Sequence, residues 1–254
     1  MSKSQPKPQM YSGFHAVESL LTHRPEAVLD ISVQISRAER EDPRLDALVA
    51  LANQHGIAVQ QARREVLEKH AGPQHQGVVA RARPRRPGNE QQLLGLLDVH
   101  SGPCTLLILE GVTDPHNLGA CLRSADAAGV TAVIVPGRNA AGLTPVVCRT
   151  AAGAAESLPY FEIGNLATLL DKLRAQGIWV MGTALQERSE NLFSITPPPE
   201  KLAIVMGAEG AGLKRLTRDK CDQLIAIPMA GTVQSLNVSV ATAVMLFHML
   251  SLRQ

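Results

Sequence analysis

Aromatic residues are scarce in this chain. Phe, Trp and Tyr together make up 3% of its 254 residues, although hydrophobic residues as a whole make up 45%. The core must therefore consist of Val, Leu, Ile and Ala, which is the composition of buried parallel strands and of the helices that cover them. For the same reason, stacking of nucleic-acid bases on aromatic side chains is not expected to dominate any binding function.

The cysteines are few and dispersed. The chain has four, with no C-x-x-C pair and no neighbouring histidine at the spacing of metal ligands: Cys104, Cys121, Cys148 and Cys221. This pattern predicts small, buried hydrophobic side chains in a reducing compartment, and it favours neither disulfides nor a metal site.

Long hydrophobic runs are missing as well. The first ten residues, MSKSQPKPQM, lack the apolar core of a secretory signal. The longest apolar run, residues 238–252, is interrupted by Ser, Thr and His and is shorter than the roughly 20 residues that a membrane helix needs. We therefore expect a soluble, cytoplasmic protein.

Neither sign of charge is in large excess, since the formal net charge is +2 at pH 7. The distribution is uneven, because residues 1–89 carry 13 Lys and Arg against 9 Asp and Glu, whereas residues 90–254 carry 12 against 14. An excess of +4 in the first part fits a nucleic-acid partner. Ordinary solvated surface charge explains it equally well.

The hydrophobic pattern divides the chain into two parts and a linker. Residues 13–21 have helical spacing and 28–35 alternate like a strand, so we expect a small α/β domain over residues 1–83. The segment 84–98 begins in a stretch rich in Arg and Pro and is interpreted as an extended, solvated linker. A role of this stretch in holding the RNA phosphate backbone is the alternative.

The remaining residues, 99–254, alternate between apolar runs and helical patterns. The runs are TLLIL, TAVIV, IWVMG, LAIVM and QLIAI. Such an order predicts a parallel sheet with helices on both faces. Ligands of these sheets bind beyond the carboxyl ends of the strands, so the loops after Leu109, Met206 and Ile227 are the candidate site.

The first of these loops leads into DPHNLGACLRSADAAG, residues 114–129. Proline is excluded from a helix interior and asparagine is a favoured cap, so a helix is expected to begin near Leu118, with Asn117 as its cap. Arg123 lies one turn after Gly119, on what we expect to be a closely packed face. A buried guanidinium needs an anionic or carbonyl partner. The partner of Arg123 could be a ligand. Alternatively, Arg123 could form a structural salt bridge with a carboxylate such as Glu110, Asp126 or Glu209.

The second loop is rich in glycine. In residues 202–213, LAIVMGAEGAGL, an apolar run leads into three glycines with Glu209 among them. Glycine lets a ligand approach the main chain, but a tight turn alone explains the composition equally well. The spacing G-x-x-G-x-G differs from the G-x-G-x-x-G of dinucleotide-binding proteins, which disfavours an oxidoreductase.

The third loop places Ser235 and Asn237 at the start of a strongly apolar helix. Taken alone, these residues are an ordinary N-cap and an early helical residue. The three loops together, each after a predicted parallel strand, are a far more specific signal than any one of them.

This set resembles the three motifs of the SpoU (TrmH) family of ribose methyltransferases, within the SPOUT class. The first motif is matched by Asp114, Pro115, Asn117, Gly119 and Arg123, the second by residues 206–212 and the third by 227–241, with SLNVSVA unbroken. Residues 13–21 and HQGVVA of the first part are similar to the small RNA-binding domain of the members that methylate a guanosine of bacterial 23S rRNA.

The resemblance implies an α/β protein with a small N-terminal RNA-binding domain and a C-terminal parallel-sheet methyltransferase domain that contains a deep trefoil knot, although knots are nearly absent from proteins. It also implies a homodimer and S-adenosylmethionine as cofactor, with no metal. The residues that the family pattern places around the cofactor are Thr183, Ala184, Gly207, Ile227, Met229 and Leu236.

The implied reaction is methylation of a ribose 2'-hydroxyl, for a guanosine in the P loop of 23S rRNA at the peptidyl-transferase centre. Arg123 would stabilise the oxygen as it loses its proton, since a guanidinium, with a pKa above about 12, is a poor base. Asn117 would position the nucleotide and Glu209 would orient Arg123 or the ribose. Ser235 and Asn237 would hold the loop and the reacting groups by hydrogen bonds.

Two alternatives remain open at this point. The same reaction on tRNA or on another rRNA site is one, because the third motif concerns the cofactor and not the RNA. A non-catalytic RNA-binding assembly factor is the other, and the presence of all the motif residues argues against it.

Overall fold

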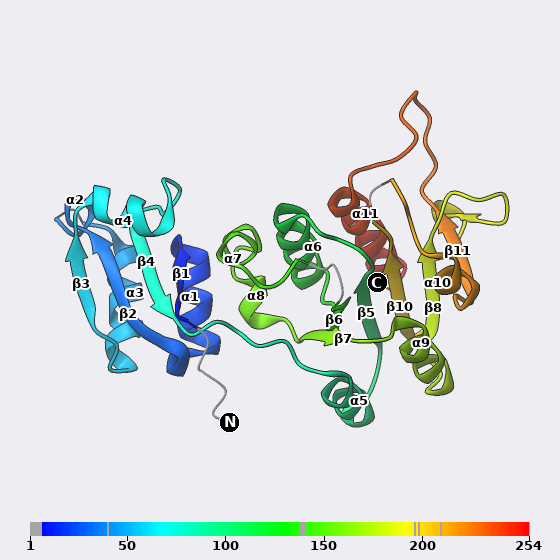
Figure 1. The fold of residues 1–254 in the computed structure, drawn as a ribbon, viewed down its shortest axis with the longest axis horizontal. Coiled ribbons are helices and arrows are strands. Elements are labelled where there is room, and N and C mark those ends of the chain that lie inside the picture. The colour runs from blue at the N-terminus through cyan, green and yellow to red at the C-terminus, as the bar shows by residue number, and fades with distance from the viewer. Residues whose placement is uncertain are drawn as a thin grey trace. The chain divides into compact units, whose positions relative to one another are not determined.

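The computed structural model describes residues 7–39, 41–137, 141–195, 197, 199–208 and 210–253. Its chain forms two compact units (Figure 1). One consists of Met1–Arg86 with Leu143–Ser157, and the other of Pro87–Gly142 with Leu158–Gln254. Residues 143–157, which the sequence assigns to the methyltransferase part, thus cluster with the first unit. The functional boundaries at residues 83 and 98 stay predictions.

The first unit is built on a four-stranded mixed sheet. Its order is β1 (Gln9–Ser12), β4 (Val78–Ala82), β2 (Val28–Gln34) and β3 (Val59–Ala62), with β4 antiparallel to β1 and β2, and β3 parallel to β2. The accompanying helices are α1 (Phe14–His23), η1 (Pro25–Ala27), α2 (Ile35–Ala38), α3 (Pro43–Gln54) and α4 (Arg64–Ala71). This unit confirms the predicted small α/β fold of the N-terminal part.

Two short helices from later in the chain complete the first unit. They are α7 (Pro145–Thr150) and α8 (Ala154–Ser157), which pack against α1 and β1. An ion pair of 2.8 Å joins Arg24 to Glu156, whose side chain is almost fully buried. The Ser19 hydroxyl donates a 2.8 Å hydrogen bond to the carbonyl of Gly153. These contacts fix the segment to α1 although more than a hundred residues separate them in sequence.

The predicted linker is only partly extended. Arg85, expected to be solvated, is partly buried and donates a hydrogen bond to the Ala155 carbonyl, and burial lowers the pKa of its guanidinium. Arg83 bonds the Glu26 carbonyl at 3.2 Å. From Glu90 the chain is helix α5 (Glu90–Val99), which starts at a capping box between Asn89 and Gln92. The extended part therefore ends at Asn89, since a cap followed by apolar residues begins a helix there.

The second unit contains a seven-stranded sheet in which every pair is parallel, as predicted. Its strands, in spatial order, are β7 (Tyr160–Ile163), β6 (Ala132–Pro136), β5 (Cys104–Leu109), β10 (Lys201–Met206), β8 (Trp179–Thr183), β11 (Gln223–Ala226) and β9 (Glu190–Asn191). The five predicted apolar runs are β5, β6, β8, β10 and β11. This strand order does not establish the predicted knot, which stays a prediction.

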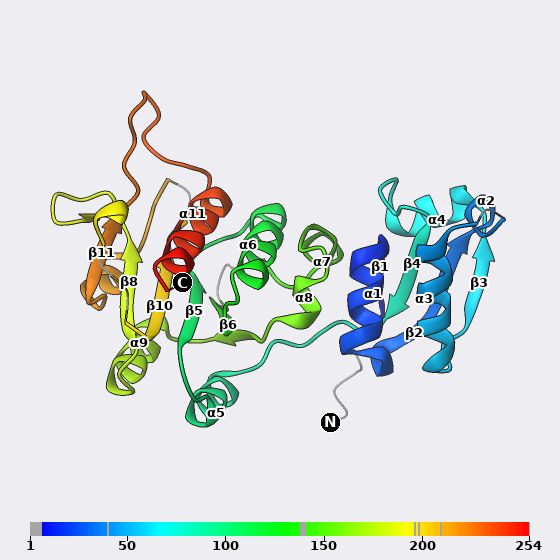
Figure 2. The same cartoon turned by 180° about the vertical axis from the view of Figure 1, so that it is seen from behind.

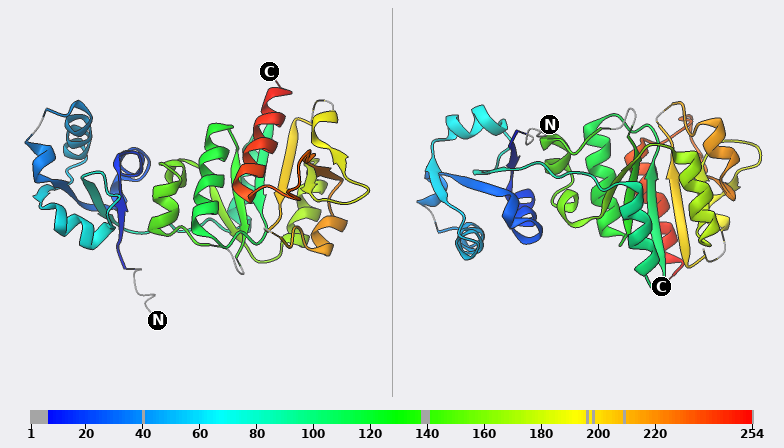
Figure 3. Two further views of the ribbon diagram at one scale, coloured as in Figure 1. Left: turned by 90° about the horizontal axis from the view of Figure 1, so that it is seen from above. Right: turned by 60° about the horizontal axis from the view of Figure 1, so that its bottom comes forward.

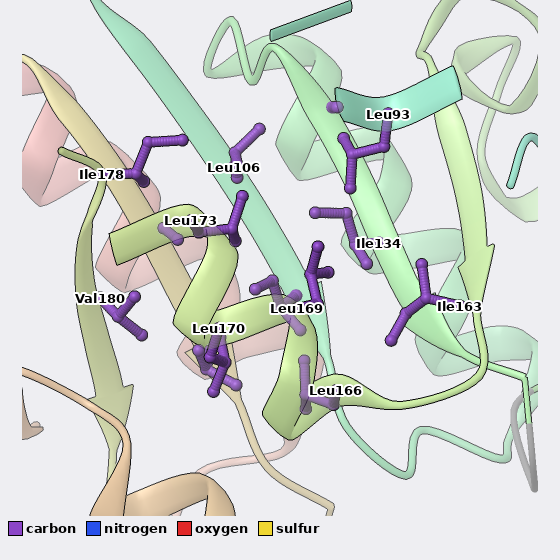
Figure 4. Close-up of a cluster of buried hydrophobic side chains, with 14 of the residues drawn as sticks. Leu93, Leu106, Ile134, Ile163, Leu166, Leu169, Leu170, Leu173, Ile178 and Val180 are labelled. Atoms are coloured by element: carbon purple, nitrogen blue, oxygen red, sulfur yellow. The ribbon is translucent and has the colours of Figure 1, made fainter. Parts of the chain in front are cut away.

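Helices cover both faces of this sheet. Leu93 of α5 and several leucines of α9 (Leu166–Ala175) pack on one face against Leu106, Ile134 and Val180 (Figure 4). The helices α6 (Pro115–Ala127) and α11 (Val238–Ser251) lie together on the opposite face (Figures 2 and 3). Short η2 (Leu192–Ser194) and α10 (Arg215–Asp219) complete the unit. The two-sided cover explains why the strands are apolar throughout.

None of the described helices combines the length and the apolar character that crossing a membrane requires.

Candidate active site

A cavity of about 380 Å³ opens at the carboxyl ends of β8, β10 and β11, next to the start of α11. Its wall contains all six residues that the family resemblance places around a cofactor: Thr183, Ala184, Gly207, Ile227, Met229 and Leu236. Parallel strands bring these residues together because their carboxyl ends meet at one edge of the sheet. The volume lies within the range of about 300–1,000 Å³ that is usual for small-molecule sites.

The glycine-rich loop folds tightly back on itself. A Cβ atom on Gly207 would stand 2.4 Å from the carbonyl carbon of Gly212 and 2.5 Å from the nitrogen of Leu213. The nitrogen of Gly212 donates a 2.9 Å hydrogen bond to the carbonyl of Ala208, and Gly212 has a φ of +63°. The loop is therefore a tight turn and the wall of the cavity at once. Glu209, the acidic residue expected in this loop, lies outside the described residues.

The first motif begins its helix earlier than expected. Helix α6 starts at Pro115, and its cap is Asp114, whose carboxylate accepts a 3.0 Å hydrogen bond from the nitrogen of His116. The prediction of Asn117 as cap with a start near Leu118 is wrong. Proline is acceptable at the first helical position, where its missing N–H would have had no helical partner.

In the third motif, an asparagine does cap the helix. Asn237, which taken alone could be an ordinary early helical residue, is the cap of α11, because its side-chain oxygen accepts a 2.9 Å hydrogen bond from the nitrogen of Ser239. Ser235, the other residue that could have been the cap, lies two residues earlier in the wall of the cavity. Because Asn237 and not Ser235 caps the helix, the Ser235 side chain is available to the site.

The two helix starts are joined directly. The Nδ2 group of Asn237 donates a 3.0 Å hydrogen bond to Oδ1 of Asn117. Asn237 follows the cavity residues Ser235 and Leu236, so this pair lies at the edge of the cavity. The structure thus brings together three of the five predicted catalytic residues.

Arg123 is exposed, and the expectation of a closely packed, buried position is wrong. The inner face of α6 is instead occupied by Leu118, Gly119, Cys121, Leu122 and Ala125. Within the described part of the chain, no hydrogen bond or ion pair involves the Arg123 guanidinium. An exposed cation without a protein partner is available to an external anion.

Glu110, considered above as a structural partner of Arg123, has a different role. This buried carboxylate at the end of β5 accepts hydrogen bonds from the nitrogen of Lys214, at 2.9 Å, and from the hydroxyl of Thr217, at 2.8 Å. It therefore fixes the start of α10, which follows the glycine-rich loop. Arg218 of this helix also lines the cavity and was not predicted, because the stretch KRLTRDK has the composition of a solvated surface.

The cysteines do not contribute to this site. All four are free; three are buried and Cys221 is partly buried, which confirms that they are small core residues. Burial raises the pKa of the Cys148 and Cys221 thiols to about 12, so both stay protonated near neutral pH. Among the described residues, no group of three or more His, Cys, Asp or Glu side chains could hold a metal ion.

Comparison with known proteins agrees with this geometry. The model of the SpoU rRNA methylase family matches residues 105–247, and a model described as RNA 2'-O ribose methyltransferase substrate binding matches residues 12–88. The 23S rRNA (guanosine-2'-O-)-methyltransferase RlmB of Pseudomonas putida is 49% identical over 95% of this chain and 96% of its own length. RlmB of Escherichia coli is 48% identical over 94% of this chain and 97% of its own.

A solved structure shares the fold as well. The AdoMet-bound rRNA methyltransferase from Sinorhizobium meliloti superposes with a TM-score of 0.75 at 26% identity, covering 96% of this chain and 87% of that one. The matched residues include all three loops described above. The chain is a member of the SpoU rRNA methylase family.

Proposed function

We propose that this protein transfers a methyl group from S-adenosylmethionine to the ribose 2'-hydroxyl of a guanosine in 23S rRNA. The observation that carries this function is its identity of 49% with a relative named for that reaction, over 95% of the chain, so both units are matched. We place the target in the P loop of the peptidyl-transferase centre. A protein that modifies ribosomal RNA acts where ribosomes assemble, so we also place it in the cytoplasm.

The cavity suits S-adenosylmethionine. Apolar side chains such as Ile227, Met229 and Leu236 can enclose the adenine, and the backbone groups of Thr183, Ala184 and Gly207 can bond its edge. The related rRNA methyltransferase from Sinorhizobium meliloti was solved with AdoMet bound. When bound, the cofactor supplies a methyl group on a sulfonium, which is an electrophile.

The protein must then position the ribose and stabilise the charge on its oxygen. Arg123, exposed and unpaired within the described residues, meets the hydroxyl or the adjacent phosphate and stabilises the alkoxide that forms. Asn117 orients the nucleotide, and its own orientation is fixed by Asn237. Ser235 supplies a hydroxyl in the cavity wall, and Glu209 orients Arg123 or the ribose.

We assign RNA selection to the first unit. Residues 12–88 match the substrate-binding model, and residues 1–89 carry the basic excess of the chain. The 2'-hydroxyl is common to all nucleotides, so a catalytic unit that recognises it needs a second element to choose the site.

We further propose that the protein is a homodimer that uses α11 as part of its interface. This helix is apolar around its circumference, and Val240 and Phe247 are 49% and 46% exposed. Phe193, which is 57% exposed, contacts the ring of His248 on the same helix. Large exposed apolar side chains in one place mark an interface. A Phe247→Glu variant that stays dimeric in sedimentation would contradict this.

The function is tested by incubating the protein with radiolabelled S-adenosylmethionine and unmodified 23S rRNA or tRNA, and mapping the new 2'-O-methyl group. Label at a single guanosine of 23S rRNA is expected. Label on tRNA would keep the reaction and change the substrate. Absence of label on free rRNA, on tRNA and on ribosomal precursor particles would favour the assembly factor.

A further inference from the structure

The part of the cavity wall that the structure describes is almost free of charge. Among the described residues that line it, Arg218 is the one with an ionised side chain; the others are apolar, glycine or neutral polar residues. Arg218 is partly buried, and the part of the chain that the structure describes gives its guanidinium no hydrogen bond and no ion pair. A partly buried guanidinium in the wall of a cavity, without a partner among the described residues, is available to an anionic ligand.

The charged neighbours of Arg218 are occupied elsewhere. Asp219 lies 3.9 Å from Arg188, and Lys220 forms a 2.5 Å ion pair with Asp171. Asp219 of α10 and Asp171 of α9 are thus paired with other cations, and neither forms an ion pair with Arg218.

The helix that carries Arg218 is held firmly. Buried Glu110 accepts hydrogen bonds from the Lys214 nitrogen and the Thr217 hydroxyl, and the Arg218 nitrogen donates to the Lys214 carbonyl at 3.0 Å. Because β5 and α10 are tied together in this way, the backbone of Arg218 has a fixed position relative to the cavity. A side chain on a fixed backbone loses less conformational freedom when it binds a ligand.

We propose that Arg218 binds the carboxylate of the amino-acid part of S-adenosylmethionine and thereby makes the cavity selective for cofactors that carry this group. This rests on the function proposed above. The cofactor has one anionic group, its carboxylate, whereas its sulfonium and ammonium groups would be repelled by a guanidinium. Guanidinium and carboxylate also match in shape, since each offers two parallel hydrogen-bonding positions.

The test is calorimetric titration with two ligands that differ in this group alone, S-adenosylhomocysteine and its decarboxylated analogue. The wild type is expected to bind S-adenosylhomocysteine roughly tenfold to a hundredfold more tightly, the range for one hydrogen-bonded charged pair. Arg218→Met retains the apolar stem and should lose this preference, with affinity for the decarboxylated ligand unchanged within about twofold. Arg218→Lys should retain part of the preference.

The matched control is Arg215→Met, on the same helix but outside the cavity wall. It should bind both ligands as the wild type does. In turnover, Arg218→Met should raise the KM for S-adenosylmethionine while kcat stays near that of the wild type, because the carboxylate is remote from the transferred methyl group.

Three results would separate the possibilities. Equal binding of both ligands by the wild type, or equal loss of both in Arg218→Met, would overturn the role of Arg218 and leave the methyltransferase function intact. Binding of neither ligand by the wild type would overturn the proposed function and this inference with it. A preference that disappears in Arg218→Met but persists in Arg215→Met supports the inference.

Discussion

Asn237 and Asn117 are 120 residues apart in sequence, and a side-chain hydrogen bond of 3.0 Å joins them. Asn237 caps α11, and Asn117 lies in the first turn of α6. The bond therefore couples the helix that carries Arg123 to the loop that lines the cavity. The residues expected to act on RNA and those expected to hold the cofactor thus share one polar connection.

Asn237→Ala should impair catalysis more than stability. The lost cap costs about 1 kcal/mol of unfolding free energy. Turnover should fall about tenfold or more because Asn117 loses its orientation. Thermal unfolding and single-turnover methylation are the measurements. Asn165→Ala is the control, since Asn165 caps α9 by the same kind of bond, to the nitrogen of Thr168. An equal loss of turnover in both variants would refute a specific role.

Arg123→Ala should reduce methylation by roughly two to three orders of magnitude without affecting the fold. The side chain is exposed, so the unfolding free energy should change by less than about 0.5 kcal/mol. Removing a group that stabilises an oxyanion costs roughly 10²- to 10³-fold in kcat. Cofactor affinity, measured by calorimetry, should stay within a few fold of the wild type. A large loss of cofactor binding would show that Arg123 serves the cavity instead.

Gly207→Ala should disrupt the cofactor loop. The added methyl group would meet the backbone of Gly212 and Leu213 at 2.4–2.5 Å, and a main chain cannot rotate away as a side chain can. We expect a loss of about 1–3 kcal/mol in stability, together with weaker cofactor binding. Gly231→Ala is the control, because a Cβ atom added to Gly231 would meet nothing within 4 Å. Normal cofactor binding by Gly207→Ala would show that the cofactor loop does not require glycine at position 207.

Glu156 should make the stability of the first unit depend on pH. Burial raises the pKa of its carboxyl above the ordinary 4.5, and Arg24 opposes this only in part. The folded state therefore holds the proton more tightly than the unfolded state. Its stabilising contribution is full below about pH 4.5 and is lost as the pH rises through the pKa of the folded state.

Denaturant unfolding at several pH values above 4.5 would measure this effect. Glu156→Gln cannot titrate, so its stability should decline less over that range than that of the wild type. Glu187→Gln, a change at an exposed carboxylate, should keep the decline of the wild type. An unchanged slope in Glu156→Gln would show that the titration of Glu156 does not influence folding.

The sheet of the second unit was predictable from sequence because buried parallel strands are continuous apolar runs, such as Leu106–Leu109 in β5. The position of the cavity was predictable for a related reason, since the carboxyl ends of such strands meet at one edge. All six expected cofactor residues do lie in its wall. Their binding of a cofactor is a prediction that titration must test.

Other features depend on contacts that the local pattern does not contain. Asp and Asn are both favoured caps, so the sequence could not show whether Asp114 or Asn117 caps α6. In the structure the cap is Asp114. The exposure of Arg123 depended on which side of α6 meets the sheet, because small residues occur all around it. Arg218 was missed since the tertiary structure alone distinguishes it from the charged residues beside it.

The first unit is assembled from two separate segments of the chain, which has a consequence for protein engineering and for evolution. Arg24 and Glu156 are 132 residues apart, yet they form an ion pair within it in which the Glu156 side chain is buried. Exchanging Met1–Arg86 for the equivalent of another methylase would separate these charges and expose the apolar residues of α7 and α8. A working chimera needs two grafts, and natural recombination at a single breakpoint could not transfer the first unit intact.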